Sequence, residues 1–148
     1  MLTEIIFIKK LHPNAVIPSY GTEFAAGADL YACIDNPISI QPQETVLIPT
    51  GIALEIPAGY VGLVYARSGL AVKRGLAPAN QVGVIDSDYR GELLVPLFNH
   101  SSDLQEVAPQ ERIAQIIFTP YLKGFFTETD TLNDTKRQDG GFGSTGKF

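Results

Sequence analysis

The sequence predicts an all-β domain, a jelly-roll-like barrel or sandwich with one short helix and a flexible, glycine-rich C-terminal arm. Short apolar runs rich in Val, Ile, Leu and Phe recur along the chain, and these residue types favour strands. The 14 glycines and 10 prolines are spread between those runs, which is the pattern of many short strands joined by turns. Strands at this spacing are typical of sandwiches, jelly rolls and barrels.

The expected strands follow one another through the first four fifths of the chain. Pro57-Ala-Gly59 is expected to turn the chain between two of them. The expected helix begins after Ser68 as its N-cap, covers residues 69–74 and ends at Gly75. In chain order, the expected strands cover residues 4–11, 29–32, 44–48, 52–56, 60–65, 81–86, 92–99 and 112–118.

We expect one domain with three parts: a core over residues 1–118, a linker arm over 119–136 and a lid over 137–148. The linker is polar and loses the strand period. An extended chain of roughly 18 residues reaches tens of ångströms, so the lid can land far from its own core, even on another subunit. Phe125 and Phe126 interrupt the polar run and are expected to dock the arm on the surface.

Composition and charge exclude several classes of protein. With 148 residues, 45% of them apolar, the chain can bury a real core. A net charge of −5 argues against a general affinity for nucleic acid or anionic membranes, so we expect neither as a partner. The lone Cys33 cannot form an internal disulfide, and no apolar run is long enough to span a bilayer. The expected location is the cytoplasm.

The glycine-rich tail indicates a cover for a nucleoside triphosphate. Its glycines allow the backbone to approach a ligand closely, and Arg137 supplies a forked cation that suits phosphate. Ser144 and Thr145 add hydroxyl donors, and the Phe142 ring can stack on a base. A flexible solvated terminus is the alternative interpretation. The segment is not a P-loop, because Phe148 stands where Ser or Thr should bind Mg²⁺.

Polar residues also gather where an expected strand ends. Ile85 runs directly into Asp86 and Asp88, and a carboxylate at a strand end can act as a general base or hold a water on a metal. The alternative is a turn in which either aspartate bonds its own backbone.

Three further segments offer polar groups to a ligand. Arg67 and Ser68 precede the expected helix, where an anion can bind, although plain N-capping is the alternative. Gln115 interrupts an apolar strand, and a buried glutamine needs a hydrogen-bond partner in a neighbouring loop or a ligand. Small residues surround the carboxylate of Asp29, which by itself indicates only a tight turn.

In chain order, these segments resemble the five motifs of the homotrimeric dUTPase family, the deoxyuridine 5′-triphosphate nucleotidohydrolases. The resemblance covers the chain from about Pro18 to its end. Ala66 and Gln138 depart from the pattern, since the family often has proline and glycine there. The motifs stand at residues 25–30 (AAGADL), 67–71 (RSGLA), 83–91 (GVIDSDYRG), 112–117 (RIAQII) and 137–146 (RQDGGFGSTG).

The resemblance implies an enzyme that hydrolyses dUTP to dUMP and pyrophosphate with Mg²⁺, which clears dUTP from the nucleotide pool and supplies dUMP for dTMP synthesis. It implies a homotrimer with active sites between subunits. In such a site Asp86 activates the water that attacks the α-phosphorus, and Asp29 lies near the water shell of the metal. The implied substrate-binding residues are Arg67, Ser68, Gly69, Asn80, Gly83, Val84, Ile85, Tyr89, Gln115, Arg137, Phe142, Gly143, Ser144 and Thr145.

The resemblance also divides the roles of these residues. Arg67, Ser68 and Gln115 hold the phosphate chain, and the tail grips the γ-phosphate and closes over the base. Asn80 contributes to uracil recognition with the backbone of the third motif, and Tyr89 lies against the deoxyribose. A dCTP deaminase, or a bifunctional dCTP deaminase and dUTPase of the same fold, is the nearest alternative. A non-catalytic β-domain that uses the same pocket is the next.

Overall fold

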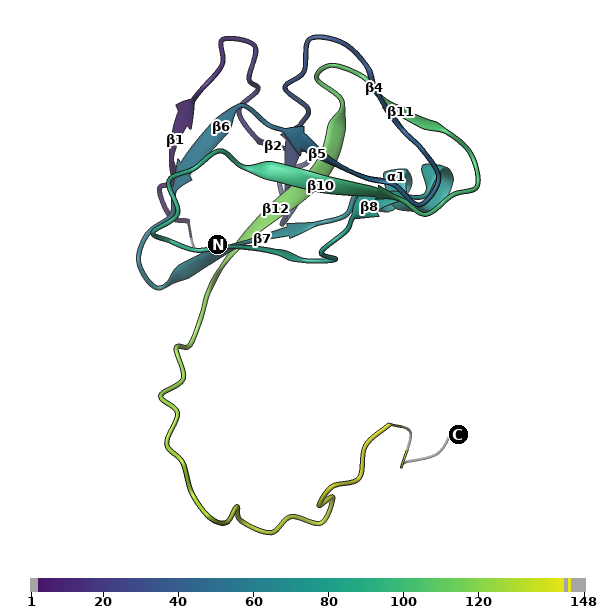
Figure 1. The fold of residues 1–148 in the computed structure, drawn as a ribbon. Helices are drawn as coiled ribbons and strands as arrows, with labels where there is room; N and C mark the ends of the chain where they lie inside the picture. The colour runs from purple at the N-terminus through teal and green to yellow at the C-terminus, as the bar shows by residue number, and fades with distance from the viewer. Residues whose placement is uncertain (1–2, 143, 145–148) are drawn as a thin grey trace.

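The structure, a computed structural model, describes residues 3–142 and 144, and Figure 1 shows a β-rich body with a long arm. The described residues form twelve strands and one helix. They are β1 (Phe7–Lys10), β2 (Ser19–Tyr20), β3 (Ala28–Tyr31), β4 (Ile38–Ile40), β5 (Thr45–Pro49), β6 (Ile52–Glu55), β7 (Tyr60–Tyr65), α1 (Ser68–Arg74), β8 (Leu76–Pro78), β9 (Gly83–Ile85), β10 (Leu94–Asn99), β11 (Gln105–Val107) and β12 (Arg112–Pro120).

The strands pair in four antiparallel sheets. The largest has the order β2-β3-β12-β7-β9, and a second has the order β5-β10-β8. The other two are the pairs β1-β6 and β11-β4. Within residues 3–142, no sheet closes on itself, so the sandwich, rather than the barrel, is the form the predicted jelly-roll-like fold takes.

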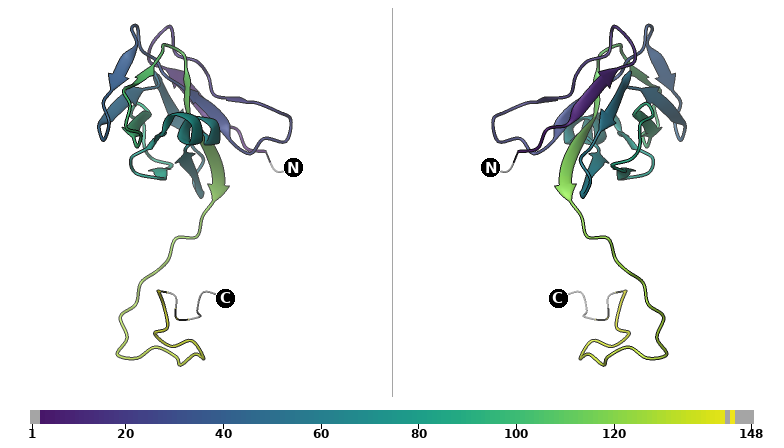
Figure 2. Two further views of the ribbon diagram at one scale, coloured as in Figure 1. Left: turned by 90° about the vertical axis from the view of Figure 1, so that its right-hand side faces the viewer. Right: turned by 90° about the vertical axis from the view of Figure 1, so that its left-hand side faces the viewer.

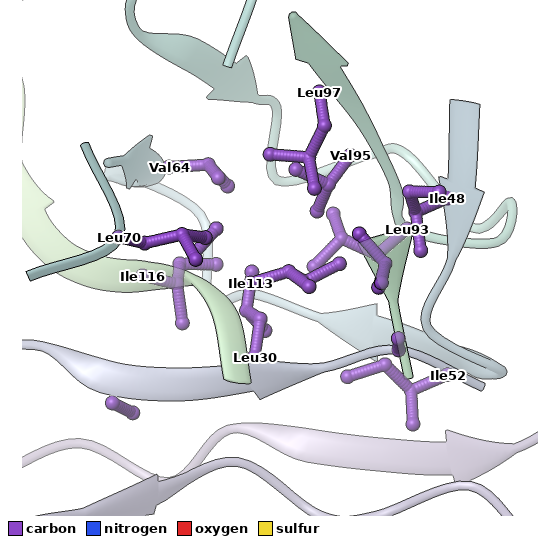
Figure 3. Packing of buried hydrophobic residues seen from close by; sticks show 14 of the residues in the cluster. Leu30, Ile48, Ile52, Val64, Leu70, Leu93, Val95, Leu97, Ile113 and Ile116 are labelled. Carbon is purple, nitrogen blue, oxygen red and sulfur yellow. The ribbon is translucent and has the colours of Figure 1, made fainter. Parts of the chain in front are cut away.

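The core lies between the two larger sheets. Figure 3 shows Leu30, Ile113 and Ile116 of the five-stranded sheet facing Val95 and Leu97 of the three-stranded sheet. All five side chains are fully buried. Removing apolar surface from water contributes about 25 cal/mol per Å², so this contact fixes the position of β12, the strand that carries part of the site.

The helix begins one residue earlier than its sequence predicts. Its N-cap is Arg67, and among the described residues no side chain makes a capping hydrogen bond there. The prediction that Ser68 caps the helix is therefore wrong, because Ser68 is already the first helical residue. Gly75 ends the helix as predicted, with φ of 65° and its N–H donating to the carbonyls of Leu70 and Ala71.

All eight predicted strands are present, but their pairing and ends differ in places. Pro57 and Tyr60 close the expected turn through a main-chain hydrogen bond of 3.1 Å. However, β6 pairs with β1, whereas β7 pairs with β12 and β9, so the turn joins two sheets. The sequence does not predict β2, β4, β8 or β11, which are only two or three residues long and show no period.

The arm follows β12, which continues two residues beyond the expected end of the core, to Pro120. Figure 2 shows it leaving the body and curling back on itself. Phe125 and Phe126 are 95% and 97% exposed. The prediction that they dock the arm on the surface is wrong for the chain's own core. In the described part of the chain, no helix is long and apolar enough to cross a membrane.

Candidate functional site

A polar pocket of about 580 Å³ lies where α1, β3 and β12 meet, and we call it the arginine pocket. It brings together residues from the first, second and fourth sequence motifs. The register of β3 and β12 places Asp29 opposite Gln115, and α1 adds its first turn from one side. The lining residues are Gly21, Ala25, Gly27, Asp29, Arg67, Ser68, Gly69, Leu70, Lys73, Arg74, Glu111, Arg112 and Gln115.

Asp29 holds two arginines in this pocket. Arg67 Nε donates to Asp29 Oδ1 at 2.8 Å, and Arg112 Nη1 donates to Oδ2 at 3.2 Å. The carboxylate is largely buried, with 13% of its side chain exposed, whereas 51% of the Arg112 side chain is exposed. A guanidinium carries five N–H donors, so each arginine keeps donors with which to bind an anion.

Arg112 is a site residue that the sequence does not single out. It lies three positions before Gln115, and in a regular strand residues three apart point to opposite faces. The register of β12 against β3 shifts between Arg112 and Ala114, which marks a β-bulge. A bulge reverses the alternation beyond it, so both side chains line the same pocket.

Gln115 is partly buried and is held by the segment before α1. Its Nε2 donates to the carbonyl of Ala66 at 2.9 Å, which is the neighbouring-loop partner that the sequence left open. Gly27 makes room for it, because a Cβ there would lie 2.2 Å from Gln115 Oε1. The requirement for glycine in the first motif therefore comes from packing beside the pocket.

A smaller pocket of about 190 Å³ lies between the end of β9 and the start of β10, and we call it the loop pocket. Asp86 and Tyr89 both line it, together with Glu92. The Asp86 side chain is exposed, and its main-chain oxygen accepts the Tyr89 N–H at 3.2 Å to close the turn. Val84, Ile85, Leu93 and Leu94 complete the lining.

Cys33 lies outside the linings of both pockets, and its sulfur packs against the turn at Gly51. Burial raises the pKa of its thiol, and the carboxylates of Glu92 and Asp35 raise that pKa further. A thiol with a raised pKa is a poor nucleophile at neutral pH.

Asn80 and Gly83 frame the turn that leads into β9. The Val82 N–H donates to the Asn80 carbonyl at 2.6 Å, and a Cβ on Gly83 would lie 3.3 Å from Asn80 Nδ2. The amide of Asn80 therefore lies over Gly83 at the start of the strand that ends in Asp86. Both residues lie outside the linings of the two pockets.

The two pockets are separated along the five-stranded sheet. Ile85 pairs with Gly62 near the start of β7, whereas Arg67 follows the end of that strand. The five residue-to-residue steps from Gly62 to Arg67 span about 17 Å of extended chain. Asp86 and the arginines of one chain therefore do not converge on one ligand atom.

The described part of the tail does not line either pocket. Arg137 Nε donates to the Gly140 carbonyl at 2.8 Å, and the Phe142 ring is fully exposed. The Ser144 N–H donates a hydrogen bond to the Gly141 carbonyl at 3.0 Å. The predicted site residues Gly143 and Thr145 lie outside the described residues.

The described residues contain no group of three or more His, Cys, Asp or Glu side chains that could hold a metal ion. A cation at this site would therefore take most of its ligands from elsewhere. Mg²⁺ suits such an arrangement, since it usually keeps several waters and binds substrate phosphates.

Comparison with known proteins gives consistent results. The family model described as dUTPase matches residues 13–146. A deoxyuridine 5′-triphosphate nucleotidohydrolase of Syntrophotalea carbinolica is 44% identical over 146 residues, which cover 99% of each chain. The protein of that name from Desulfitobacterium hafniense is 53% identical over 131 residues, covering 88% of this chain and 87% of its own.

Solved structures of similar proteins cover almost the whole chain. A mutant dUTPase of phage 80alpha is 27% identical, with a TM-score of 0.87, and the match covers 97% of this chain and 99% of that one. Another mutant of the Staphylococcus bacteriophage 80alpha dUTPase, with dUpNHpp, is 26% identical, with a TM-score of 0.85. That match covers 98% of this chain and 100% of the phage protein.

Proposed function

The chain belongs to the dUTPase family, and on this premise we propose that it hydrolyses dUTP to dUMP and pyrophosphate. The observation that carries the proposal is the arginine pocket, which gathers residues of three motifs around Asp29. Two arginines, a hydroxyl and an amide suit the oxygens of a phosphate chain. The loop pocket adds a carboxylate and an aromatic ring, the two groups still needed.

Asp86 is the base in the proposed reaction. Its carboxylate takes a proton from a water molecule, whose oxygen attacks the α-phosphorus. The bond from the α-phosphorus to the bridging oxygen breaks, and the leaving pyrophosphate keeps that bonding pair. The exposure of Asp86 beside Tyr89 supports this role, because a general base must reach the proton that it removes.

The arginine pocket holds the phosphates in this proposal. Arg67, Ser68 and Gln115 contact phosphate oxygens, with the backbone at Gly69, and Arg112 joins them as a further cation. Asp29 orients both arginines, which favours binding because their side chains lose less freedom when the ligand arrives. The expectation from the sequence that Asp29 reaches the water shell of a metal stays a prediction. Contact with that water shell would use the same two carboxylate oxygens that hold the arginines.

Selection of deoxyuridine falls to the third motif. Asn80 and the backbone of Gly83, Val84 and Ile85 would read the hydrogen-bonding edge of uracil. Cytosine presents the opposite pattern of donors and acceptors and would leave buried groups unpaired, which is costly. The Tyr89 ring would lie against the deoxyribose and leave no space for a 2′-hydroxyl.

Mg²⁺ would arrive with the triphosphate. When bound, it would neutralise part of the charge on the phosphate oxygens. Mg²⁺ usually keeps several waters and binds substrate phosphates, so it would need few protein ligands at this site.

The separation of the two pockets supports an active site shared between subunits. One chain would supply the arginine pocket and a second chain the loop pocket. The arm of a third would bring Arg137, Phe142, Gly143, Ser144 and Thr145 over the ligand. The extended arm and its exposed aromatic rings support this reach. We therefore propose a homotrimer that works in the cytoplasm.

Product analysis tests the function. We expect pyrophosphate release from dUTP in the presence of Mg²⁺, with at least about a hundredfold lower kcat/KM for dCTP, dTTP and UTP. Release of ammonia from dCTP would instead identify a deaminase. Light scattering of the same preparation measures the oligomeric state, and an active monomer would contradict the shared site.

A further inference from the structure

The Tyr89 ring is held by its own loop. Its hydroxyl donates to the main-chain carbonyl of Glu92 at 2.9 Å, so the side chain folds back over the residues that follow it. The ring is still 45% exposed and lines the loop pocket. One face is therefore available to a ligand while the hydroxyl end is fixed.

Gly91 makes this arrangement possible. A Cβ on Gly91 would lie 2.4 Å from Tyr89 Oη and 2.6 Å from Cζ. Real Cβ atoms essentially never approach other heavy atoms so closely. Any side chain at position 91 must therefore displace the ring from this position or break its hydrogen bond.

Glu92, whose carbonyl accepts the hydrogen bond from Tyr89, is itself bonded to another turn of the fold. Glu92 Oε1 accepts the N–H of Gly51 at 2.8 Å. Next to it, the Leu93 carbonyl accepts both the Thr50 N–H at 3.2 Å and the Thr50 hydroxyl at 2.6 Å, and the Leu93 N–H donates to Ile52 at 2.9 Å. We call these hydrogen bonds between residues 50–52 and 92–93 the Glu92 clamp.

The Glu92 clamp is attached to a tightly packed part of the core. Thr50 and Leu93 are almost fully buried. Gly51 has φ of 67°, and a Cβ there would lie 2.6 Å from Cys33 Sγ and 2.8 Å from Ala15 Cβ. The anchor of the Tyr89 loop is therefore packed tightly, although the loop itself lies at the surface.

We propose that Gly91 and the Glu92 clamp set the position of the Tyr89 ring, and that this position determines how strongly the site rejects ribonucleotides. Gly91 and Glu92 are positioning residues that act through Tyr89. The inference rests on the proposed function, in which the ring lies against the sugar. A 2′-hydroxyl adds one oxygen, so a displacement of the ring by even about 1 Å changes whether it fits.

The test is the ratio of kcat/KM for dUTP to kcat/KM for UTP. Loss of folded protein lowers both values in parallel and leaves the ratio unchanged, whereas a displaced ring lowers the ratio. We compare Gly91→Ala, Glu92→Ala, Glu92→Gln and Tyr89→Phe with the native chain. Tyr60→Phe is the matched control, because it removes another tyrosine hydroxyl, bonded to Glu4 at 2.9 Å, outside both pockets.

Gly91→Ala should lower the ratio by about tenfold or more. Glu92→Ala and Tyr89→Phe should each lower it by about three- to tenfold, the equivalent of one lost hydrogen bond. Glu92→Gln keeps an oxygen acceptor for the Gly51 N–H and should restore the native ratio, as should Tyr60→Phe. If Gly91→Ala fails to fold, the Glu92→Ala and Glu92→Gln pair decides.

An unchanged ratio in Glu92→Ala, with dUTP still hydrolysed, would overturn the inference and leave the proposed function intact. Ratios lowered equally in Glu92→Ala and Glu92→Gln would also overturn the inference, because the side-chain oxygen that accepts the Gly51 N–H would then not determine the ratio. A native chain that does not hydrolyse dUTP would instead refute the proposed function.

Discussion

The arginine pocket and the loop pocket hold their polar groups in opposite ways. In the arginine pocket, a nearly buried Asp29 fixes two arginines by charge-assisted hydrogen bonds. In the loop pocket, Asp86 is exposed, and hydrogen bonds to main-chain atoms hold the loop around it. The first arrangement prepares a fixed positive surface, whereas the second presents one carboxylate to solvent. In the proposed function, binding and chemistry therefore fall to different parts of the chain.

The largest effect should come from the loop pocket. Asp86→Asn removes the proposed base but keeps the size of the side chain, so kcat should fall by about 10²- to 10⁴-fold while the affinity for dUpNHpp stays nearly native. Rates of pyrophosphate release and calorimetric titration measure the two quantities. Asp88→Asn on the same loop is the control and should stay within a few fold of native. Near-native turnover of Asp86→Asn would remove that residue from the chemistry.

The arm should affect the arginine pocket through the triphosphate. Deleting residues 137–148 leaves every described strand, since β12 ends at Pro120, so the assembly should still fold. The value of kcat/KM for dUTP should fall roughly a hundredfold, because the lid no longer positions the substrate. Binding of dUMP should change much less, since it lacks the γ-phosphate. Equal weakening of dUMP and dUpNHpp would show that the arm does not read the triphosphate.

Asp29→Asn tests what organises the arginine pocket. Loss of the charge that holds Arg67 and Arg112 should raise KM for dUTP about tenfold with little change in kcat. Asp35→Asn, at an exposed site, is the control. A Mg²⁺ titration separates the two roles of Asp29. An unchanged half-saturating Mg²⁺ concentration supports the arginine role, and an increased one supports the metal role.

The smallest effect should come from Gly27→Ala. The added Cβ must displace Gln115, which would lose its hydrogen bond to Ala66, and KM for dUTP should rise about three- to tenfold. Gly21→Ala is a close control, because Gly21 lines the same pocket but a Cβ there meets nothing within 4 Å. Similar kinetics for both variants would mean that Gln115 does not depend on Gly27.

The sequence predicts the fold class and the long strands because the apolar period survives wherever a strand covers one face of the core. It does not predict which strands pair when they lie far apart in the sequence. The turn at Pro57 is therefore predicted correctly, but the sequence does not show that this turn joins two different sheets. The β-bulge in β12 cannot be predicted from the residue pattern. For this reason the sequence does not identify Arg112 as a site residue, although it lies in a recognised motif.

The motifs themselves could be found from the sequence because their polar residues interrupt strands or follow them directly. Their division into two pockets depends on the register of β7 and β9, which no local pattern encodes. The error at Ser68 is also local. A serine before a helix suits the N-cap position, but here the extended backbone of Arg67 takes it.

The central claim is that the arginine pocket and the loop pocket of one chain serve different active sites. Two variants, Arg67→Ala and Asp86→Asn, each disable one pocket. The two variants carry different affinity tags and are co-expressed in equal amounts. Purification on both tags in turn retains only the assemblies that contain both variants. In a closed ring of three subunits, every mixed assembly has one site of three with two intact pockets, and we predict about a third of the native rate. A mixture no more active than either variant alone would contradict the claim.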